Sequence, residues 1–155
     1  MTMEQIIELV QGFDGVLVVA PGPGDNTPEL AWGDSFFYYA PDGRMPANVQ
    51  PYATIVTKDY PGDTASKLDR QGRWRINIHV SPAKFLELTG EAPPTIKRPW
   101  SYDVPDTVVP HPVYGPLGWV AIVNPGDSTI ETVTELLRTA HAAARARYER
   151  RQNTN

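Results

Sequence analysis

Two arginines, an amide and an imidazole alternate along one short segment, and these side chains are well suited to binding or converting a small molecule. The segment is RWRINIHV, residues 73–80. The two-residue period of a β-strand gives it an apolar face of Trp74, Ile76, Ile78 and Val80, and a polar face of Arg73, Arg75, Asn77 and His79. Arginine suits bidentate binding of carboxylate or phosphate, and histidine is a natural acid or base near neutral pH. Either the polar face is the floor of a pocket, or it is a back face that is solvated or holds a loop.

A second group of candidates is aromatic. The stretch WGDSFFYYAPDG carries Trp32, Phe36, Phe37, Tyr38 and Tyr39 within eight residues. Alternation along a strand places rings on both of its faces, and two large rings left in water would be unfavourable. A proline-rich loop could cover them, or Trp32, Tyr38 and Tyr39 could wall a ligand pocket. In HPVYGPLGW, the glycines indicate a tight structural turn, from which His111 and Tyr114 could reach a pocket rim.

Other motifs argue against several kinds of site. PGPGD, residues 21–25, lacks the Lys-Ser/Thr pair of a phosphate-binding loop. The histidines have no helical metal-ligand spacing, the chain has no cysteine, and no serine lies in a Gly-x-Ser-x-Gly turn. We therefore expect no metal and no cofactor, and we expect His141 on the surface of a helix.

The expected elements form an α+β fold. Thr2 and Gln5 make a capping box that opens a helix to about residue 11, and a second box at Ser128 and Glu131 opens a long helix to about residue 150. A shorter helix covers 82–90. The expected strands cover 15–20, 35–40, 52–57, 73–80 and 118–123, separated by long loops at 58–72 and 91–117. This order predicts a single α+β domain over 1–155: one antiparallel sheet of about five strands, with N- and C-terminal helices packed on one face. The basic tail from about 150 is expected to fray.

Composition limits the partners. The net charge is −4, although residues 138–155 alone carry five arginines against one glutamate. An acidic body argues against nonspecific nucleic-acid binding, which depends on neutralising phosphates. The absence of cysteine, of a signal peptide and of any long apolar run favours a cytoplasmic protein without a membrane partner. These features are compatible with a homodimer.

The longest motifs resemble a known family. WGDSFFYYAPDG, YATIVTKDYPGDTASKLDR, RINI and HPVYGPLGWVAIVNP together resemble an actinobacterial family of uncharacterised proteins, domain-of-unknown-function family 6194. The resemblance covers nearly the whole chain and implies a bacterial, cytosolic, single-domain protein, with no catalytic residues assigned. It also implies glycine where this chain has His79. The closing strand and helix are more loosely similar to the YjbR-like α+β fold.

These observations lead to two functional hypotheses. The first is a small, cofactor-independent bacterial enzyme, of the isomerase, lyase or cyclase type, in specialised biosynthesis. Arg75 and Asn77 would bind a small anionic or carbonyl-bearing metabolite, and His79 would move a proton. The second is a non-catalytic module that binds a small molecule or a protein through an aromatic-walled pocket. A buried His79 beside a carboxylate would favour the enzyme, and a hydrophobic pocket with no titratable group near it would favour the module.

Overall fold

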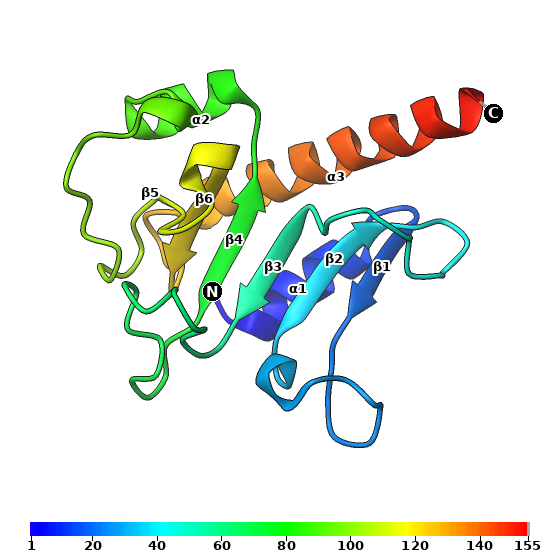
Figure 1. Cartoon of the computed structure of the whole chain (residues 1–155), viewed down its shortest axis with the longest axis horizontal. Helices are drawn as coiled ribbons and strands as arrows, with labels where there is room; N and C mark the ends of the chain where they lie inside the picture. The colour runs from blue at the N-terminus through cyan, green and yellow to red at the C-terminus, as the bar shows by residue number, and fades with distance from the viewer. Residues whose placement is uncertain (155) are drawn as a thin grey trace.

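The computed structural model describes residues 1–154, which form one six-stranded antiparallel sheet and three α-helices (Figure 1). In chain order the elements are α1 (Met3–Gln11), β1 (Val16–Val19), β2 (Ser35–Tyr39), β3 (Ala53–Val56), β4 (Arg75–His79), α2 (Pro82–Thr89), β5 (Val109–Pro110), β6 (Trp119–Val123) and α3 (Ile130–Asn153). The strands lie in the order β1-β2-β3-β4-β6-β5. The predicted α+β class and single antiparallel sheet are confirmed.

The sheet has six strands rather than about five, and the additional strand is β5. Its two residues, Val109 and Pro110, pair with Ala121 and Val120 of β6. They belong to the proline-rich segment 91–117, which the sequence predicts as a loop. A strand this short leaves no alternating pattern to detect, and proline is tolerated because β5 lies at the sheet edge.

The N-terminal helix forms as its sequence predicts. The Gln5 amide N–H donates to the Thr2 hydroxyl at 3.1 Å, and the Thr2 amide N–H donates to the Gln5 side chain at 2.9 Å. This reciprocal capping box satisfies two amides that the first turn leaves without helical partners. Ile6 and Val10, one turn apart, are then buried against the sheet.

The C-terminal helix begins differently from the prediction. Its N-cap is Thr129, which makes no capping hydrogen bond, so the predicted Ser128–Glu131 box is wrong. Instead the Asp106 carboxylate accepts from the Gly126 amide at 2.7 Å, the Ser128 amide at 3.0 Å and the Thr129 hydroxyl at 2.6 Å. These hydrogen bonds, that of Thr129 foremost, lower the pKa of Asp106 to about 2. The helix continues to Asn153, past the predicted end near residue 150.

The main core lies between the sheet and the helices. In Figure 1, α1 and α3 both cross behind the strands, and the C-terminal turns of α3 extend beyond the sheet. Ile76 and Ile78 of β4 are completely buried in the cluster that holds Leu136 and Leu137 of α3. The predicted orientation of β4 is therefore confirmed, and Arg75 and Asn77 point to the opposite, outer face.

Loops cover part of this outer face. Val56 of β3 and Val123 of β6 pack with Leu68 in a second, small apolar cluster, and Tyr60 packs against it. Leu68 and Tyr60 belong to the loop between β3 and β4, so this loop is folded onto the sheet. Within residues 1–154, no helix combines the length and apolar character that crossing a membrane would need.

Candidate functional site

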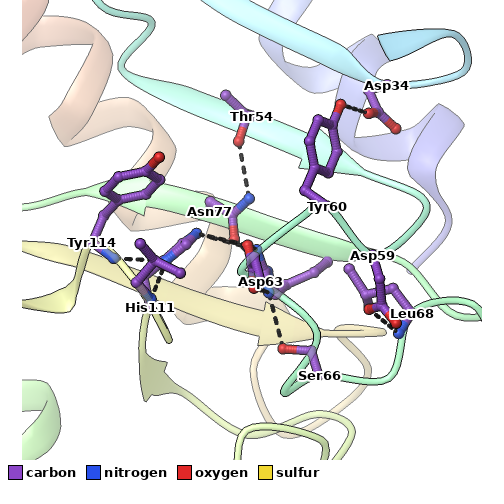
Figure 2. A network of polar contacts seen from close by, with 12 residues as sticks. Asp34, Thr54, Asp59, Tyr60, Asp63, Ser66, Leu68, Asn77, His111 and Tyr114 are labelled. Atoms are coloured by element: carbon purple, nitrogen blue, oxygen red, sulfur yellow. Dashed lines mark hydrogen bonds and ion pairs between the residues drawn. The ribbon is translucent and has the colours of Figure 1, made fainter. Parts of the chain in front are cut away.

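Arg75 and Asn77 lie in a buried polar network on the outer face. Figure 2 labels Asn77 with Asp63, Ser66, Thr54 and His111 of this network. The Arg75 guanidinium donates to both oxygens of the Asp63 carboxylate, at 3.0 Å from Nη1 and 2.6 Å from Nη2. It also donates to the Ser66 hydroxyl at 3.0 Å and, through Nε, to the Asn77 side-chain oxygen at 2.7 Å. The Asn77 amide group donates to the Thr54 hydroxyl on β3 at 3.0 Å. These contacts join the centre of the sheet to the loop that covers it.

A tight turn positions Asp63. Tyr60 and Asp63 are bridged by two backbone hydrogen bonds, from the Asp63 amide at 2.8 Å and from the Tyr60 amide at 3.3 Å. Between them lie Pro61 and Gly62, whose φ of 80° is in the left-handed region. Proline followed by glycine suits a turn whose third residue needs positive φ. The turn directs the Asp63 carboxylate toward β4.

The same loop is fixed at its start by Asp34, which lies just before β2 and is 1% exposed. One carboxylate oxygen accepts from the Thr57 amide at 2.8 Å and from Lys58 Nζ at 3.0 Å, while the other accepts from the Tyr60 hydroxyl. Burial, followed by the hydrogen bond to Asp34, raises the pKa of Tyr60. Tyr60 therefore stays neutral and serves as a hydrogen-bond donor.

His111 completes the network, and its contacts define its protonation state. Its Nδ1 accepts hydrogen bonds from the backbone amides of Val113 and Tyr114, both at 3.0 Å. A neutral imidazole must then carry its proton on Nε2. Nε2 lies 3.1 Å from Arg75 Nη2, a donor, and 3.8 Å from the Asp63 carboxylate. The contact between His111 and Arg75 therefore brings two N–H groups together, and the Asp63 carboxylate is the nearby acceptor.

The pKa values agree with this assignment. Burial, followed by the charge of Arg75, lowers the pKa of His111 to about 4, against the attraction of Asp63. For Asp63, burial acts to raise the pKa, but the hydrogen bonds and charge of Arg75 outweigh it and lower the pKa. At neutral pH the network holds a neutral imidazole beside an arginine–carboxylate pair. The Arg75, Asp63 and Asn77 side chains already have protein partners, so the network links the sheet to its covering loop rather than forming an open site.

A separate groove lies at the other end of β4, between α2, the 3₁₀ helix Gly115–Leu117 and α3. Its volume is about 890 Å³. Most of the side chains along it are apolar, and they include Val80, Ala83, Leu86, Pro93, Leu117 and Ala143. Leu86 is 51% exposed and Leu117 is 69% exposed at the rim. Exposed leucines beside a concave apolar surface are typical of binding grooves.

His79 lines this groove and is separated from the functional groups of Arg75 and Asn77. Its ring is tilted against Trp119, with the centroids 5.5 Å apart. Burial, followed by the charge of Arg147, lowers the pKa of His79, so the imidazole is neutral at neutral pH. No carboxylate lies among the groove residues. The predicted Arg75–Asn77–His79 face is therefore divided between a closed network and an open groove.

The predicted aromatic residues do not gather around His79. Trp32 donates through its indole N–H to the Thr27 hydroxyl at 3.2 Å, and Tyr38 is largely buried. Tyr39 packs edge-on against Tyr148 of α3 and borders a smaller pocket of about 340 Å³. Tyr114 is 51% exposed, with its ring 5.0 Å from that of His111. None of these rings lines the larger groove.

Of the residues that line the groove, the sequence predicted only His79 as a site residue, and it misplaced His141, which contacts the groove residue Tyr52. Arg147 of α3 and Tyr52, just before β3, line the groove. His141, expected on the surface, is buried: its Nδ1 lies 2.9 Å from the Tyr52 hydroxyl and its Nε2 lies 2.8 Å from the Asp14 carbonyl oxygen. The sequence around His141 is rich in alanine. Because alanine is small and only weakly hydrophobic, the helical hydrophobic pattern is weak there and does not show which face of α3 is buried. The only available signal is the helical spacing of His141 from the buried Leu137.

The described part of the chain has no cluster of possible metal ligands. Among residues 1–154, no three His, Asp or Glu side chains lie together in a way that could hold a metal ion. Asp59, a possible ligand by type, instead accepts from the Leu68 amide at 2.9 Å and helps to close its loop. The two sites of interest are therefore the buried polar network and the apolar groove.

The fold and these two features define a small α+β protein. A buried polar network holds a loop against its sheet, and a large apolar groove lies at one end of β4. The chain belongs to a family of unknown function, DUF6194, whose model matches residues 1–153. The comparisons with curated proteins and with solved structures each gave no match. The looser resemblance to the YjbR-like fold therefore stays a prediction.

Proposed function

We propose that the protein is a non-catalytic binding protein that takes up an apolar small molecule in the groove between α2 and α3. The observation that carries this proposal is the groove itself, about 890 Å³ in volume and mostly apolar along its walls. Sites for small molecules typically have volumes of about 300–1,000 Å³ and a few placed polar groups. Removing apolar ligand surface from water would supply roughly 25 cal/mol per Å².

The polar network supports binding rather than catalysis. A general acid or base must reach the proton that it transfers, and the Arg75 and Asn77 side chains are already engaged by protein partners. Among the described residues that line the groove with His79, none is a carboxylate that could orient the imidazole or return a proton to it. The groove has titratable side chains, His79 among them, but its lining residues include no carboxylate, so the pair that would favour the enzyme is missing.

A neutral fluorescent dye tests this proposal. N-phenyl-1-naphthylamine brightens in apolar surroundings and carries no charge, so it reports the groove walls alone. Ala143 is exposed and lines the groove, so Ala143→Trp would fill the groove without disturbing the core. Ala142→Trp is the matched control, because Ala142 is exposed on the same helix and does not line the groove.

We expect saturable binding at one site in the wild type, retained in Ala142→Trp and lost in Ala143→Trp, with unchanged circular dichroism. Failure of the wild type to bind the dye, or equal binding by both variants, would overturn the proposal. Melting temperatures of the two variants show whether lost binding reflects a lost fold.

An acid–base enzyme is the second candidate, and the half-buried His79 is the observation that favours it. A neutral imidazole in an apolar groove can accept a proton from a carbonyl-bearing ligand, since its burial and Arg147 keep its pKa below the usual 6.5. The test is deuterium uptake at C3 of 2-oxooctanoate in D₂O, followed by proton NMR. An enzyme would accelerate the exchange, and His79→Ala would abolish the acceleration.

The wider setting is also part of the proposal. We place the protein in the cytoplasm of an actinobacterium, with a role in small-molecule biosynthesis. The lack of cysteine supports the cytoplasmic location, and the resemblance of the long motifs to an actinobacterial family supports the source. The proposed partner is a small molecule rather than nucleic acid or a membrane, and a homodimer is compatible with it. The net charge of −4 argues against nucleic acid as a partner.

A further inference from the structure

The ionisable side chains along the groove have an uneven distribution of charge. Apart from Tyr52, all of them are basic: His79, Lys84 and Arg147. No aspartate or glutamate lines the groove, although acidic residues outnumber lysine and arginine in the chain by 18 to 14. A groove that collects only basic groups in an acidic protein is electrostatically suited to a negatively charged ligand.

The two permanent charges of the groove differ in their partners. Lys84 Nζ lies 3.4 Å from the Glu87 carboxylate and 3.3 Å from the Glu135 carboxylate, so protein groups already balance its charge. Arg147 is partly buried, and among residues 1–154 no ion pair joins it to a carboxylate. Arg145, two residues earlier, pairs with Glu149 at 2.9 Å. Arg147 thus brings an unbalanced positive charge to an apolar groove.

Partial burial makes this charge costly to leave without a partner. Burial, followed by repulsion from Arg150 and Arg151, lowers the pKa of Arg147, which nevertheless stays protonated at neutral pH. A charge in partly desolvated surroundings interacts more strongly with an opposite charge than it would in water. A bound anion would relieve the repulsion and gain from the apolar surroundings.

We infer that the groove selects an amphipathic monocarboxylate, whose head group binds the Arg147 guanidinium beside His79 and whose apolar body lies against Leu86 and Leu117. This inference rests on the proposed binding function. The planar guanidinium presents paired N–H donors that match the two oxygens of a carboxylate. One unbalanced arginine matches a single negative charge. A dianion such as a phosphate monoester would require a further cation, and Lys84 is already engaged by Glu87 and Glu135.

Three ligands of nearly equal size test the inference: octanoate, 1-octanol and octylamine. Each is measured at neutral pH by displacement of N-phenyl-1-naphthylamine and by titration calorimetry. The variants are Arg147→Gln and, as a control, Arg150→Gln, which removes the same charge from an exposed site on the same helix outside the groove. Charge-assisted hydrogen bonds contribute about 1.5–3 kcal/mol, which corresponds to about 10- to 150-fold in affinity.

We expect octanoate to bind wild type at least about tenfold more tightly than 1-octanol, and octylamine to bind most weakly. Arg147→Gln should abolish the preference for octanoate over 1-octanol, while Arg150→Gln should retain it. Equal binding of octanoate and 1-octanol to wild type would overturn the inference, as would a preference that survives in Arg147→Gln.

A measurement on the wild type alone covers the case in which Arg147→Gln does not fold. Added sodium chloride should weaken octanoate binding and leave 1-octanol binding unchanged, and equal salt dependence of the two ligands would overturn the inference. Dye binding distinguishes failure of the head-group inference from failure of the proposed binding function. If N-phenyl-1-naphthylamine binds and the octanoate preference is absent, the inference about the head group fails alone. If the dye does not bind, the groove is not a binding site and both proposals fail.

Discussion

Arg75 of β4 and Asp63 of the loop before it form a bidentate ion pair, with N–O distances of 3.0 Å and 2.6 Å. The Arg75 side chain is 1% exposed and that of Asp63 is 14% exposed. Two charges withdrawn from water in this way add little net stability as a pair, but removal of one leaves the other buried and uncompensated. The pair therefore makes the folded state depend on the 58–72 loop lying against the sheet.

Asp63→Ala should consequently lower the free energy of unfolding by about 3–5 kcal/mol, because Arg75 would lose both oxygens of the carboxylate with which it pairs. Urea denaturation measures the loss. Glu8→Ala is the control, since it removes one negative charge from an exposed position of α1 and should change stability by less than about 0.5 kcal/mol. Similar losses in the two variants would show that the buried pair has no special role.

His111→Asn should reduce the dependence of stability on pH. The pKa of His111 is lowered from 6.5 to about 4 in the folded protein, so between these values the unfolded chain binds a proton that the native state does not. Stability is therefore complete above 6.5 and falls as the pH drops toward 4, by at most about 1.4 kcal/mol per pH unit. An asparagine oxygen could still accept the Val113 amide in an Asx turn. Urea titrations at several pH values should give a shallower slope for the variant, and an unchanged slope would contradict the assignment.

Tyr52→Phe should destabilise the protein by about 1–3 kcal/mol, because His141 Nδ1 would lose its donor inside the core. The direction of this hydrogen bond follows from the other ring nitrogen. His141 Nε2 faces the Asp14 carbonyl, so it carries the proton and Nδ1 accepts from the Tyr52 hydroxyl. Tyr114→Phe removes a hydroxyl from a ring that is 51% exposed and should be nearly neutral in thermal melts. Equal effects would indicate that the Tyr52–His141 contact adds nothing.

Gly118→Ala should destabilise the protein more than Gly43→Ala. Both glycines have positive φ, 94° and 73°, so each alanine would carry backbone strain of about 1 kcal/mol or more. At Gly118, the added methyl group would also lie 3.2 Å from the Val80 carbonyl oxygen and 3.5 Å from His79 Nε2, whereas Gly43 has open space. Thermal melts compare the two variants, and equal losses would mean that the groove wall yields freely at Gly118.

The fold was largely predictable from local patterns. Thr2 and Gln5, and the alternation of Ile76 and Ile78 with Arg75 and Asn77, act over a few residues, and their periods are visible in the sequence. The start of α3 was not predictable, because its anchor Asp106 lies 22 residues before Ser128. A contact over that distance depends on how the proline-rich segment folds, which no periodicity encodes.

The sequence predicted several residues of the candidate sites, but it did not predict which of them lie together in space. Alternation correctly places Arg75 and Asn77 on the outer face, but it cannot show that a loop supplies Asp63 as their partner. Alternation likewise groups His79 with them, whereas the groove at the end of β4 brings it together with Arg147. Arg147 comes from α3, 68 positions along the chain from His79, so only the packing of the helix on the sheet reveals the groove.

His79 should couple ligand binding to pH, and its neighbours determine the sign. In the free protein burial and Arg147 hold the pKa of His79 below its usual 6.5, and Lys84 is the other cation that lines the groove. An anion bound at Arg147 would stabilise the imidazolium and raise that pKa, so binding would take up protons. Octanesulfonate, which stays ionised throughout, should therefore bind wild type more tightly as the pH falls from about 7.5 to about 5.5, by at most roughly tenfold per pH unit.

His79→Gln should flatten this dependence while leaving the melting temperature within about 2 °C, because the imidazole is only half-buried. Calorimetry at several pH values in two buffers of different ionisation enthalpy would measure the proton uptake directly. A flat profile in wild type would place the anion away from His79, and a slope that persists in His79→Gln would assign the uptake to a different group.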